Sequence, residues 1–195
     1  MYHIKKGEIY MKKGHLIIVS GPSGVGKGTV INELMKQEEL NLRYSVSCTT
    51  RQPRQGEIDG VHYYFVSHEK FDEMIAQNAF LEYAKFVENS YGTPKAKVEE
   101  QLEAGLNVLL EIEMKGAIQV IEQCPEAISI FILPPSIEEL EKRLRGRQTE
   151  TEEVIVKRLA QAHDDLAMKN HYQYHVVNDT VENTVNEIKE IILNH

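Results

Sequence analysis

Four short runs of apolar residues form the strongest pattern along the chain. The runs are HLIIVS (15–20), NVLLEIE (107–113), AISIFIL (127–133) and YHVVN (174–178). Each has the length of a buried strand, and amphipathic helical stretches separate most of them. Strands that alternate with helices are typical of an α/β protein whose central sheet is parallel. The pattern therefore predicts a parallel core sheet covered by helices.

The last third of the chain has the apolar spacing of helices. Ser136 and Glu139 have the separation of a capping box, in which a hydroxyl and a carboxylate satisfy free N–H groups at a helix start. Asp179 and Glu182 repeat that separation. The pattern predicts three helices, over residues 137–147, 149–170 and 180–195.

The segment between the first helix and the second apolar run has a different character. Its stretch YSVSCTTRQPRQGEIDGVHYYFVS is rich in Thr, Tyr and Val, and Pro53, Gly56 and Gly60 interrupt it. These residues favour short strands joined by turns. We therefore predict a small β-rich insertion at about residues 46–94.

Length and composition indicate one folded domain. With 195 residues, of which 42% are hydrophobic, the chain can bury one sizeable core. We assign that domain to residues 14–195. Residues 1–13 contain lysines but no apolar stretch of a signal peptide, so we expect a flexible tail.

Charge and cysteine content exclude several function classes. The net charge of −8 argues against a protein that binds nucleic acid or an anionic membrane. No apolar run reaches the length of a membrane span. The two cysteines, Cys48 and Cys124, are far apart and lack zinc-site spacing, which favours a reduced, cytoplasmic protein without a zinc centre.

The stretch SGPSGVGKGT after the first apolar run has the pattern of a phosphate-binding loop, or P-loop. Gly21 is followed by four residues and then by Gly26 and Lys27, between a predicted strand and a predicted helix. Glycines let successive N–H groups point at an anion, and the lysine reaches the β and γ phosphates. The strict pattern has Ser or Thr after the lysine, whereas Gly28 and Thr29 stand here. We expect Mg²⁺ to be held by Thr29 or through water.

Two arginines in the insertion point to a second phosphate. Arg51 and Arg54 lie three residues apart, and arginine pairs suit bidentate capture of a phosphate. Taken alone, two such arginines would more often be solvated surface residues.

The chain as a whole closely resembles the guanylate kinase family, the P-loop kinases that phosphorylate GMP. The resemblance covers about residues 15–190, and the family's blocks appear in order. These blocks are SGPSGVGKGT, SVSCTTRQPRQGEIDGVHYYFVS, FLEYAKFVENSYGTP, LLEIEMKGA, PPSIEELEKRLRGRQTETEEVIVKRL and VVND. The resemblance implies a three-layer P-loop nucleoside monophosphate kinase fold with a GMP-binding insertion and a helical lid at about residues 138–168.

The resemblance also implies the binding residues. Those implied for ATP are Gly21, Pro22, Ser23, Gly24, Val25, Gly26, Lys27, Gly28, Thr29 and, beside the adenine, Asn178. Those implied for GMP are Ser47, Arg51, Arg54, Tyr63, Glu82, Tyr91, Thr93, Glu111 and Glu113. Guanine offers N1–H and N2–H₂ as donors, so carboxylates are natural acceptors for it. The family commonly has Asp-Ile-Asp where this chain has Glu111 and Glu113, which leaves open which carboxylate approaches the metal.

The residues implied to be catalytic are Lys27, Arg51, Arg143, Arg147 and Arg158. Phosphoryl transfer needs alignment and charge neutralisation, and the GMP phosphate is already largely a dianion at pH 7, so no general base is required. The lid arginines would close over the γ phosphate. Their alternative role is ordinary pairing with neighbouring glutamates along a helix.

The sequence thus predicts a cytoplasmic kinase of purine nucleotide metabolism that uses ATP and Mg²⁺ to phosphorylate GMP and dGMP. Its expected partners are these nucleotides, and we expect a monomer or homodimer. Two alternatives remain open. One is a non-catalytic guanylate kinase-like interaction module, and the other is a P-loop kinase for another acceptor, such as AMP or a sugar phosphate.

Overall fold

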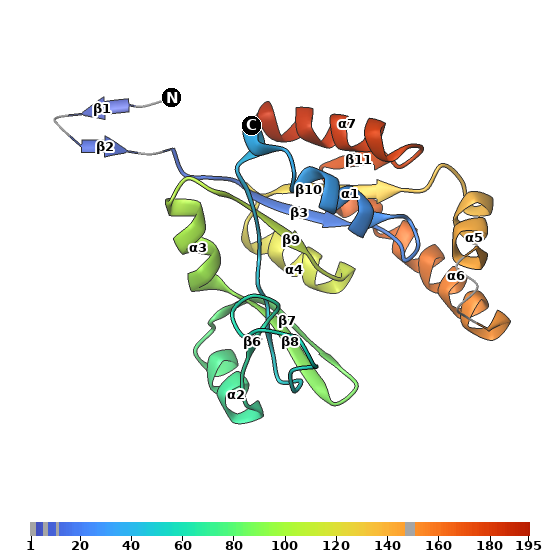
Figure 1. Cartoon of the computed structure of the whole chain (residues 1–195), viewed down its shortest axis with the longest axis horizontal. Coiled ribbons are helices and arrows are strands. Elements are labelled where there is room, and N and C mark those ends of the chain that lie inside the picture. Colours follow the sequence, from blue (N-terminus) through green and yellow to red (C-terminus); the bar gives the residue numbers. More distant parts are fainter. Residues whose placement is uncertain (1–2, 6–7, 11, 147–150) are drawn as a thin grey trace.

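A five-stranded parallel sheet forms the core of the protein (Figure 1). The computed structural model describes residues 3–5, 8–10, 12–146 and 151–195. The sheet has the order β11-β10-β3-β9-β4. Its strands are β3 (Leu16–Ser20), β4 (Leu42–Tyr44), β9 (Asn107–Glu111), β10 (Ile128–Leu133) and β11 (Tyr174–Val177). The parallel sheet and the four predicted strands are confirmed.

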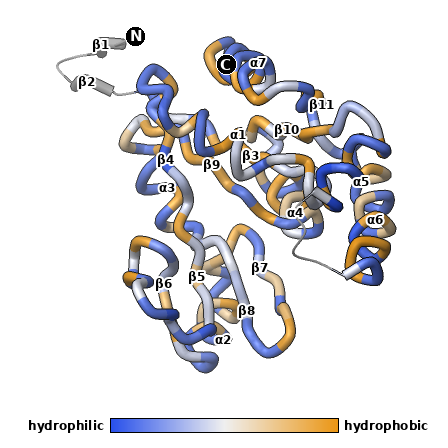
Figure 2. The backbone as a smooth tube through the Cα atoms, turned by 45° about the vertical axis from the view of Figure 1, so that its right-hand side comes forward, coloured by the Kyte–Doolittle hydropathy of each residue, from blue (hydrophilic) through white to orange (hydrophobic). Residues whose placement is uncertain are grey.

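Helices cover both faces of this sheet, which explains why its three central strands, β10, β3 and β9, are mainly apolar. Successive side chains of a strand point to opposite faces. Ile17 and Val19 of β3 pack with one group of helices, and Ile18 packs with another. The first group includes α1 (Lys27–Leu34) and α7 (Val181–Leu193), and the second includes α3 (Lys95–Glu103) and α4 (Met114–Gln123). The predicted three-layer arrangement is therefore confirmed, and Figure 2 shows the hydrophobic stretches of the central strands.

The insertion forms a second, mixed sheet below the core sheet in Figure 1. Its order is β6-β5-β8-β7, with β5 and β6 parallel and the other pairs antiparallel. Its elements are β5 (Cys48–Thr49), β6 (Tyr64–Phe65), α2 (His68–Ala76), β7 (Phe80–Phe86) and β8 (Asn89–Pro94). Phe71 and Phe80 stack at 4.5 Å between ring centroids and give this unit its own small core.

Two helices follow β10 at the position expected for the lid. They are α5 (Ile137–Arg145) and α6 (Glu152–Ala167), joined through residues outside the described ranges. The Ser136 hydroxyl accepts a hydrogen bond from the Glu139 N–H, so the predicted cap is confirmed on the serine side. Leu140 and Leu144 bury one side of α5 against the core.

The predicted cap of the last helix is wrong by one residue. Thr180, not Asp179, lies at the N-cap of α7 and accepts from the Asn183 N–H. Asp179 instead accepts from the backbone N–H of Thr180 and from the side chain of Asn183. A threonine and an aspartate stand side by side here, and the spacing rule alone does not choose between them.

Short elements occupy the remaining described segments. They are β1 (His3–Lys5), β2 (Glu8–Tyr10) and the 3₁₀ turns Glu38–Leu40 and Lys169–His171. Strands β1 and β2 pair antiparallel within the segment expected to be a tail. None of the helices in the described part of the chain is long and apolar enough to cross a bilayer.

Candidate active site

The glycine-rich loop connects β3 to α1 at the carboxyl edge of the core sheet. Gly24 and Gly26 have φ angles of 87° and 100°, in the left-handed region that favours glycine. The loop borders a cavity of about 410 Å³. The cavity is lined by Ser23, Gly24, Gly26, Lys27, Gly28, Thr29, Asn32 and Glu111. Most of the predicted P-loop residues therefore surround one hollow at the N-terminus of a helix, where an anion is favoured.

The Lys27 ammonium is held inside this loop. Its Nζ donates to the carbonyl of Gly21 at 2.6 Å and to that of Pro22 at 3.3 Å. Burial lowers the pKa of Lys27, and the negative charges of Glu111 and Asp165 oppose that shift. The Lys27 ammonium is thus bonded to the loop that surrounds it and lies where a nucleotide phosphate would enter.

The Val25 carbonyl is anchored from outside the loop. It accepts hydrogen bonds from Asn178 Nδ2 at 2.7 Å and from Arg143 Nη1 at 3.3 Å. The Thr184 hydroxyl shares its one proton between Asn178 Oδ1, at 3.0 Å, and the Thr180 carbonyl, at 2.8 Å, and so helps to orient the amide. Because the C=O and N–H of a trans peptide point in opposite directions, this anchor directs the Gly26 N–H away from Asn178.

This geometry differs from the role expected for Asn178. The sequence predicts that Asn178 flanks the adenine, yet its side chain is buried and bonded to Val25 and Thr184. Contact with adenine stays a prediction. The anchoring role escaped sequence reasoning because Val25 and Asn178 are 153 positions apart and nothing local links them.

The three predicted lid arginines lie in different settings. Arg143 reaches the P-loop, as described above, and also pairs with Glu139. Arg158 is half-buried on the side of α6 that carries the buried Ile155 and Ala162. Arg147 lies outside the described residues.

A second, smaller cavity of about 90 Å³ lies between the core sheet and the insertion. It is lined by Tyr44, Ser45, Ser47, His62, Tyr63, Thr93, Leu110, Glu111 and Ile112. Four of the residues predicted to bind GMP therefore come together here, namely Ser47, Tyr63, Thr93 and Glu111. Glu111 also lines the P-loop cavity, so one carboxylate borders both hollows.

Tyr44 orients this shared carboxylate. Its hydroxyl donates to Glu111 Oε2 at 3.0 Å. Burial and the charge of Glu111 raise the pKa of Tyr44, so the hydroxyl keeps its proton and remains a donor. Sequence reasoning missed Tyr44 because its strand is only three residues long and carries no apolar run.

Glu82 is hydrogen-bonded to Thr93, which lines the smaller cavity. The Thr93 hydroxyl donates to Glu82 Oε1 at 2.6 Å in a buried setting. Burial raises the pKa of Glu82, hydrogen bonds from Thr93 oppose the shift, and the charge of Glu113 adds to it. A Cβ on Gly116 of α4 would lie 2.6 Å from Glu82 Oε2, so only glycine leaves room for the carboxylate.

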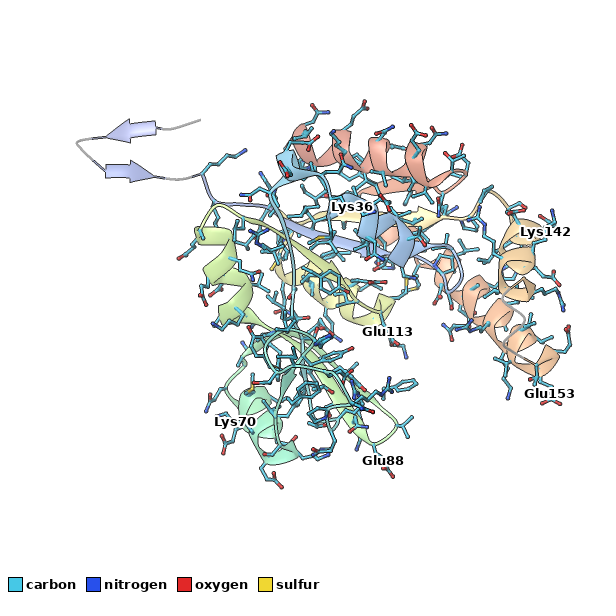
Figure 3. The ribbon with its side chains drawn as sticks, in the orientation of Figure 1. Lys36, Lys70, Glu88, Glu113, Lys142 and Glu153 are labelled. Atoms are coloured by element: carbon cyan, nitrogen blue, oxygen red, sulfur yellow. The ribbon has the colours of Figure 1, made fainter. Side chains whose placement is uncertain are left out.

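Glu113, at the start of α4, is the third carboxylate of the predicted GMP site, after Glu82 and Glu111. It is exposed at the N-cap position, where its side chain forms no capping hydrogen bond. Figure 3 shows it on the side of the core that faces β7 and β8. Glu111 and Glu113 thus take different positions, with only Glu111 bordering the P-loop cavity.

Arg51 is the centre of an aromatic and acidic cluster in the insertion. Its guanidinium lies 5.5 Å from the centroid of the Tyr63 ring, and the Tyr63 and Tyr91 rings are 6.0 Å apart. Both of its terminal nitrogens donate to Glu57, at 3.0 and 2.8 Å. The guanidinium of Arg51 and the backbone N–H of Arg54 lower the pKa of Glu57 to about 2.

Sequence reasoning grouped the arginines with Tyr63 and Tyr91 but missed Glu57. The structure brings Arg51, Tyr63 and Tyr91 together, whereas the Arg54 side chain is exposed. The available signal was the position of Glu57, three residues after Arg54 within the same turn-rich stretch.

The parallel sheet, the glycine loop at its carboxyl edge and the helix that begins at Lys27 define an α/β protein of the P-loop nucleotide-binding class. Residues 13–195 match the family described as Guanylate kinase, and the chain belongs to that family.

Individual relatives agree with this assignment. The chain is 53% identical to a guanylate kinase of Clostridioides difficile, over 94% of this chain and 89% of that protein. It is 54% identical to a guanylate kinase of Mycoplasma mycoides, over 93% of this chain, but it spans only 61% of that relative's length. The crystal structure of guanylate kinase from Anaplasma phagocytophilum is similar with a TM-score of 0.70 and 34% identity, over 94% and 86% of the two chains.

The Val25 anchor predicts a specific loss of ATP binding. Thr184→Val keeps the shape of the side chain but removes the hydroxyl that orients Asn178. Loss of one such hydrogen bond, about 1 kcal/mol, weakens ATP binding about fivefold by misaligning the Gly26 N–H. Titration calorimetry with ATP measures the change. Asn186→Ala, at an exposed position of the same helix, is the control. Wild-type ATP affinity in both Thr184→Val and Asn178→Ala would contradict the anchoring role.

The raised pKa of Glu82 predicts pH-dependent recognition of the guanine base. A raised pKa means that protonation begins above the ordinary glutamate value of 4.5, and the protonated group accepts fewer hydrogen bonds. Guanosine affinity therefore falls on the acid side, at a higher pH than an ordinary glutamate would cause. Guanosine serves as ligand because it lacks the phosphate, whose own pKa near 6 would confuse the profile.

Two variants complete this test. Glu82→Gln binds guanosine more weakly and loses the acid-side decline, since an amide does not titrate. Glu88→Gln, in the exposed turn between β7 and β8, retains the wild-type profile (Figure 3). An unchanged decline in Glu82→Gln would remove Glu82 from base recognition.

Proposed function

We propose that this protein transfers the γ-phosphoryl group of ATP to GMP, and also to dGMP, giving ADP and the nucleoside diphosphate. One observation carries the proposal: Glu111 lines both the P-loop cavity and the cavity beside the insertion, so the two hollows meet at one carboxylate. Two phosphate-bearing ligands bound in these hollows would face each other. Membership of the guanylate kinase family supports the same reaction.

Recognition of guanine is assigned to the polar groups around the smaller cavity. The ionised Glu82 accepts from N1–H and N2–H₂ of guanine, and Ser47 supplies a hydroxyl that donates to O6. The Thr93 hydroxyl keeps its one proton on Glu82 and holds that carboxylate beside the base. Adenine lacks the N2 amine and would leave the carboxylate unpaired. An unpaired buried polar group of this kind discriminates between bases by about 10⁴-fold or more.

The GMP phosphate is assigned to the arginine and tyrosine cluster. Arg51 is flanked by Tyr63 and Tyr91, and Arg54 lies on the same turn. Guanidinium groups bind phosphate through two parallel hydrogen bonds, which fixes the angle of approach as well as the position. The acceptor oxygen is thereby aimed at the P-loop cavity.

Transfer itself requires cations and alignment. The acceptor oxygen of GMP is largely deprotonated at pH 7, so no side chain has to remove a proton. Lys27 exchanges its bonds to loop carbonyls for bonds to the β and γ phosphates. Arg143, Arg147 and Arg158 belong to the proposed lid, whose closure adds positive charge around the transferred group and excludes water.

The residues of the P-loop cavity suit Mg²⁺. Thr29 and Glu111 offer a hydroxyl and a carboxylate, the hard oxygen ligands that Mg²⁺ prefers, and the ion usually takes its other ligands from phosphates and water. Bound there, Mg²⁺ would neutralise charge on the phosphate oxygens. A side chain at Gly28 would meet no atom within 4 Å, so the hydroxyl of the strict motif is missing although there is room for it.

The setting in which the reaction takes place is inferred from composition. We expect ATP and GMP as partners, a monomer or homodimer, and no nucleic acid, given the net charge of −8. Both cysteines are free thiols, which is compatible with a reduced cytoplasmic setting.

A coupled assay of ADP release tests the proposal. Wild-type protein with ATP and Mg²⁺ is offered GMP, dGMP, AMP, CMP and UMP in parallel. Turnover confined to GMP, with weaker use of dGMP, is the expected result. Turnover with AMP or a sugar phosphate would favour a kinase for another acceptor. Binding of GMP without turnover would favour a non-catalytic interaction module.

Removal of the Lys27 cation tests whether the phosphate donor and GMP bind at different sites. Lys27→Ala lowers kcat by about 10³-fold or more, because the charge on the transferred group loses its nearest cation. GMP affinity, measured by titration without ATP, stays within about twofold of wild type because GMP binds in the other hollow. Lys36→Ala, at an exposed lysine paired with Glu33 near the end of α1, is the control (Figure 3). A Lys27→Ala variant that keeps most of its rate would overturn the assignment.

A further inference from the structure

Glu57 connects the two arginines of the predicted phosphate site, and it lines neither of the two cavities described above. Its carboxylate accepts from Nη1 and Nη2 of Arg51 at 3.0 and 2.8 Å. The same carboxylate accepts from the backbone N–H of Arg54 at 2.7 Å. In return, the Glu57 N–H donates to the Arg54 carbonyl at 3.0 Å, which closes the turn between them.

The donors of Arg51 show which edge of the guanidinium faces away from Glu57. A guanidinium has five N–H donors. Nη1 uses its two on Glu57 and on the Gln52 carbonyl, at 3.0 and 2.8 Å, and Nη2 uses one on Glu57. The other Nη2 donor and the Nε donor lie on the second edge of the same plane, and Tyr91 is a further hydrogen-bond partner of the Arg51 side chain. That edge has the two-donor geometry that binds a phosphate.

Contacts with two aromatic rings hold the guanidinium plane of Arg51 in place. The Arg51 guanidinium lies 5.5 Å from the centroid of Tyr63 and 5.8 Å from that of Phe65. The Arg51 and Glu57 side chains are only 15% and 18% exposed, so solvent screens this pair less than an ordinary surface pair. A free arginine loses considerable rotamer entropy when it binds a ligand, whereas one already fixed does not.

We propose that Glu57 is a positioning residue for GMP, which holds one edge of Arg51 and the turn at Arg54 so that the second edge of Arg51 meets the phosphate. The inference rests on the proposed function, because it requires GMP to bind in the insertion. Its direct competitor is that Glu57 occupies the phosphate position itself and must be displaced. The two alternatives predict opposite changes in GMP affinity when the charge of Glu57 is removed.

Titration calorimetry of Glu57→Gln without ATP distinguishes them. The expected result is GMP binding about tenfold weaker than in wild type, because Arg51 is no longer fixed before the ligand arrives. Guanosine, which lacks the phosphate, binds both proteins equally. Glu57→Asp keeps the charge but has a shorter side chain, so its GMP affinity lies between those of wild type and Glu57→Gln. Glu73→Gln, an exposed carboxylate of α2 that pairs with Lys70, behaves as wild type.

Each other outcome overturns the inference. Unchanged GMP affinity in Glu57→Gln would mean that Arg51 does not need the carboxylate, and tighter binding would mean that Glu57 occupies the phosphate position. Equal weakening of GMP and guanosine would mean that the substitution disturbs the insertion generally, a change that thermal unfolding would also reveal. Failure of wild-type protein to bind GMP would instead contradict the proposed function, and the inference with it.

Discussion

The common direction of the five core strands is the constraint on which the site depends. Because all five run parallel, their carboxyl ends share one edge of the sheet. The P-loop follows β3, Glu111 ends β9, the lid helices follow β10 and Asn178 follows β11. Groups that are far apart in sequence thus arrive at one place without any long-range motif. An antiparallel strand among them would have carried its group to the opposite edge.

Three carboxylates around the candidate site share a second property, since each accepts a hydrogen bond from another side chain of the protein. Tyr44 donates to Glu111, Thr93 donates to Glu82, and Arg51 donates to Glu57. A buried carboxylate without such a partner would carry a substantial desolvation cost. Partners on the protein also fix the direction of the remaining lone pairs, so the acceptors are arranged in advance for a ligand that presents N–H groups or a cation.

Much of this arrangement could be predicted from sequence, and the failures have physical causes. The central strands and the P-loop were predictable because burial on both faces and glycine geometry leave local signals. Strand β4 gave no signal because only Leu42 of its three residues is buried. The anchor between Val25 and Asn178 depends on contacts across the sheet, and the pairing of Arg51 with Glu57 depends on how a turn folds. Neither follows from spacing, which is why the adenine role expected for Asn178 did not anticipate its contact with the loop.

The internal bonds of Lys27 affect which anions the loop admits. Its ammonium already donates to the carbonyls of Gly21 and Pro22, so an entering anion exchanges existing hydrogen bonds for new ones and meets no bare charge. A small ion such as chloride offers little in that exchange. A polyphosphate chain bonds several loop N–H groups at once and gains at each of them. A ligand is therefore favoured by the number of simultaneous contacts that it makes with the loop as well as by its charge.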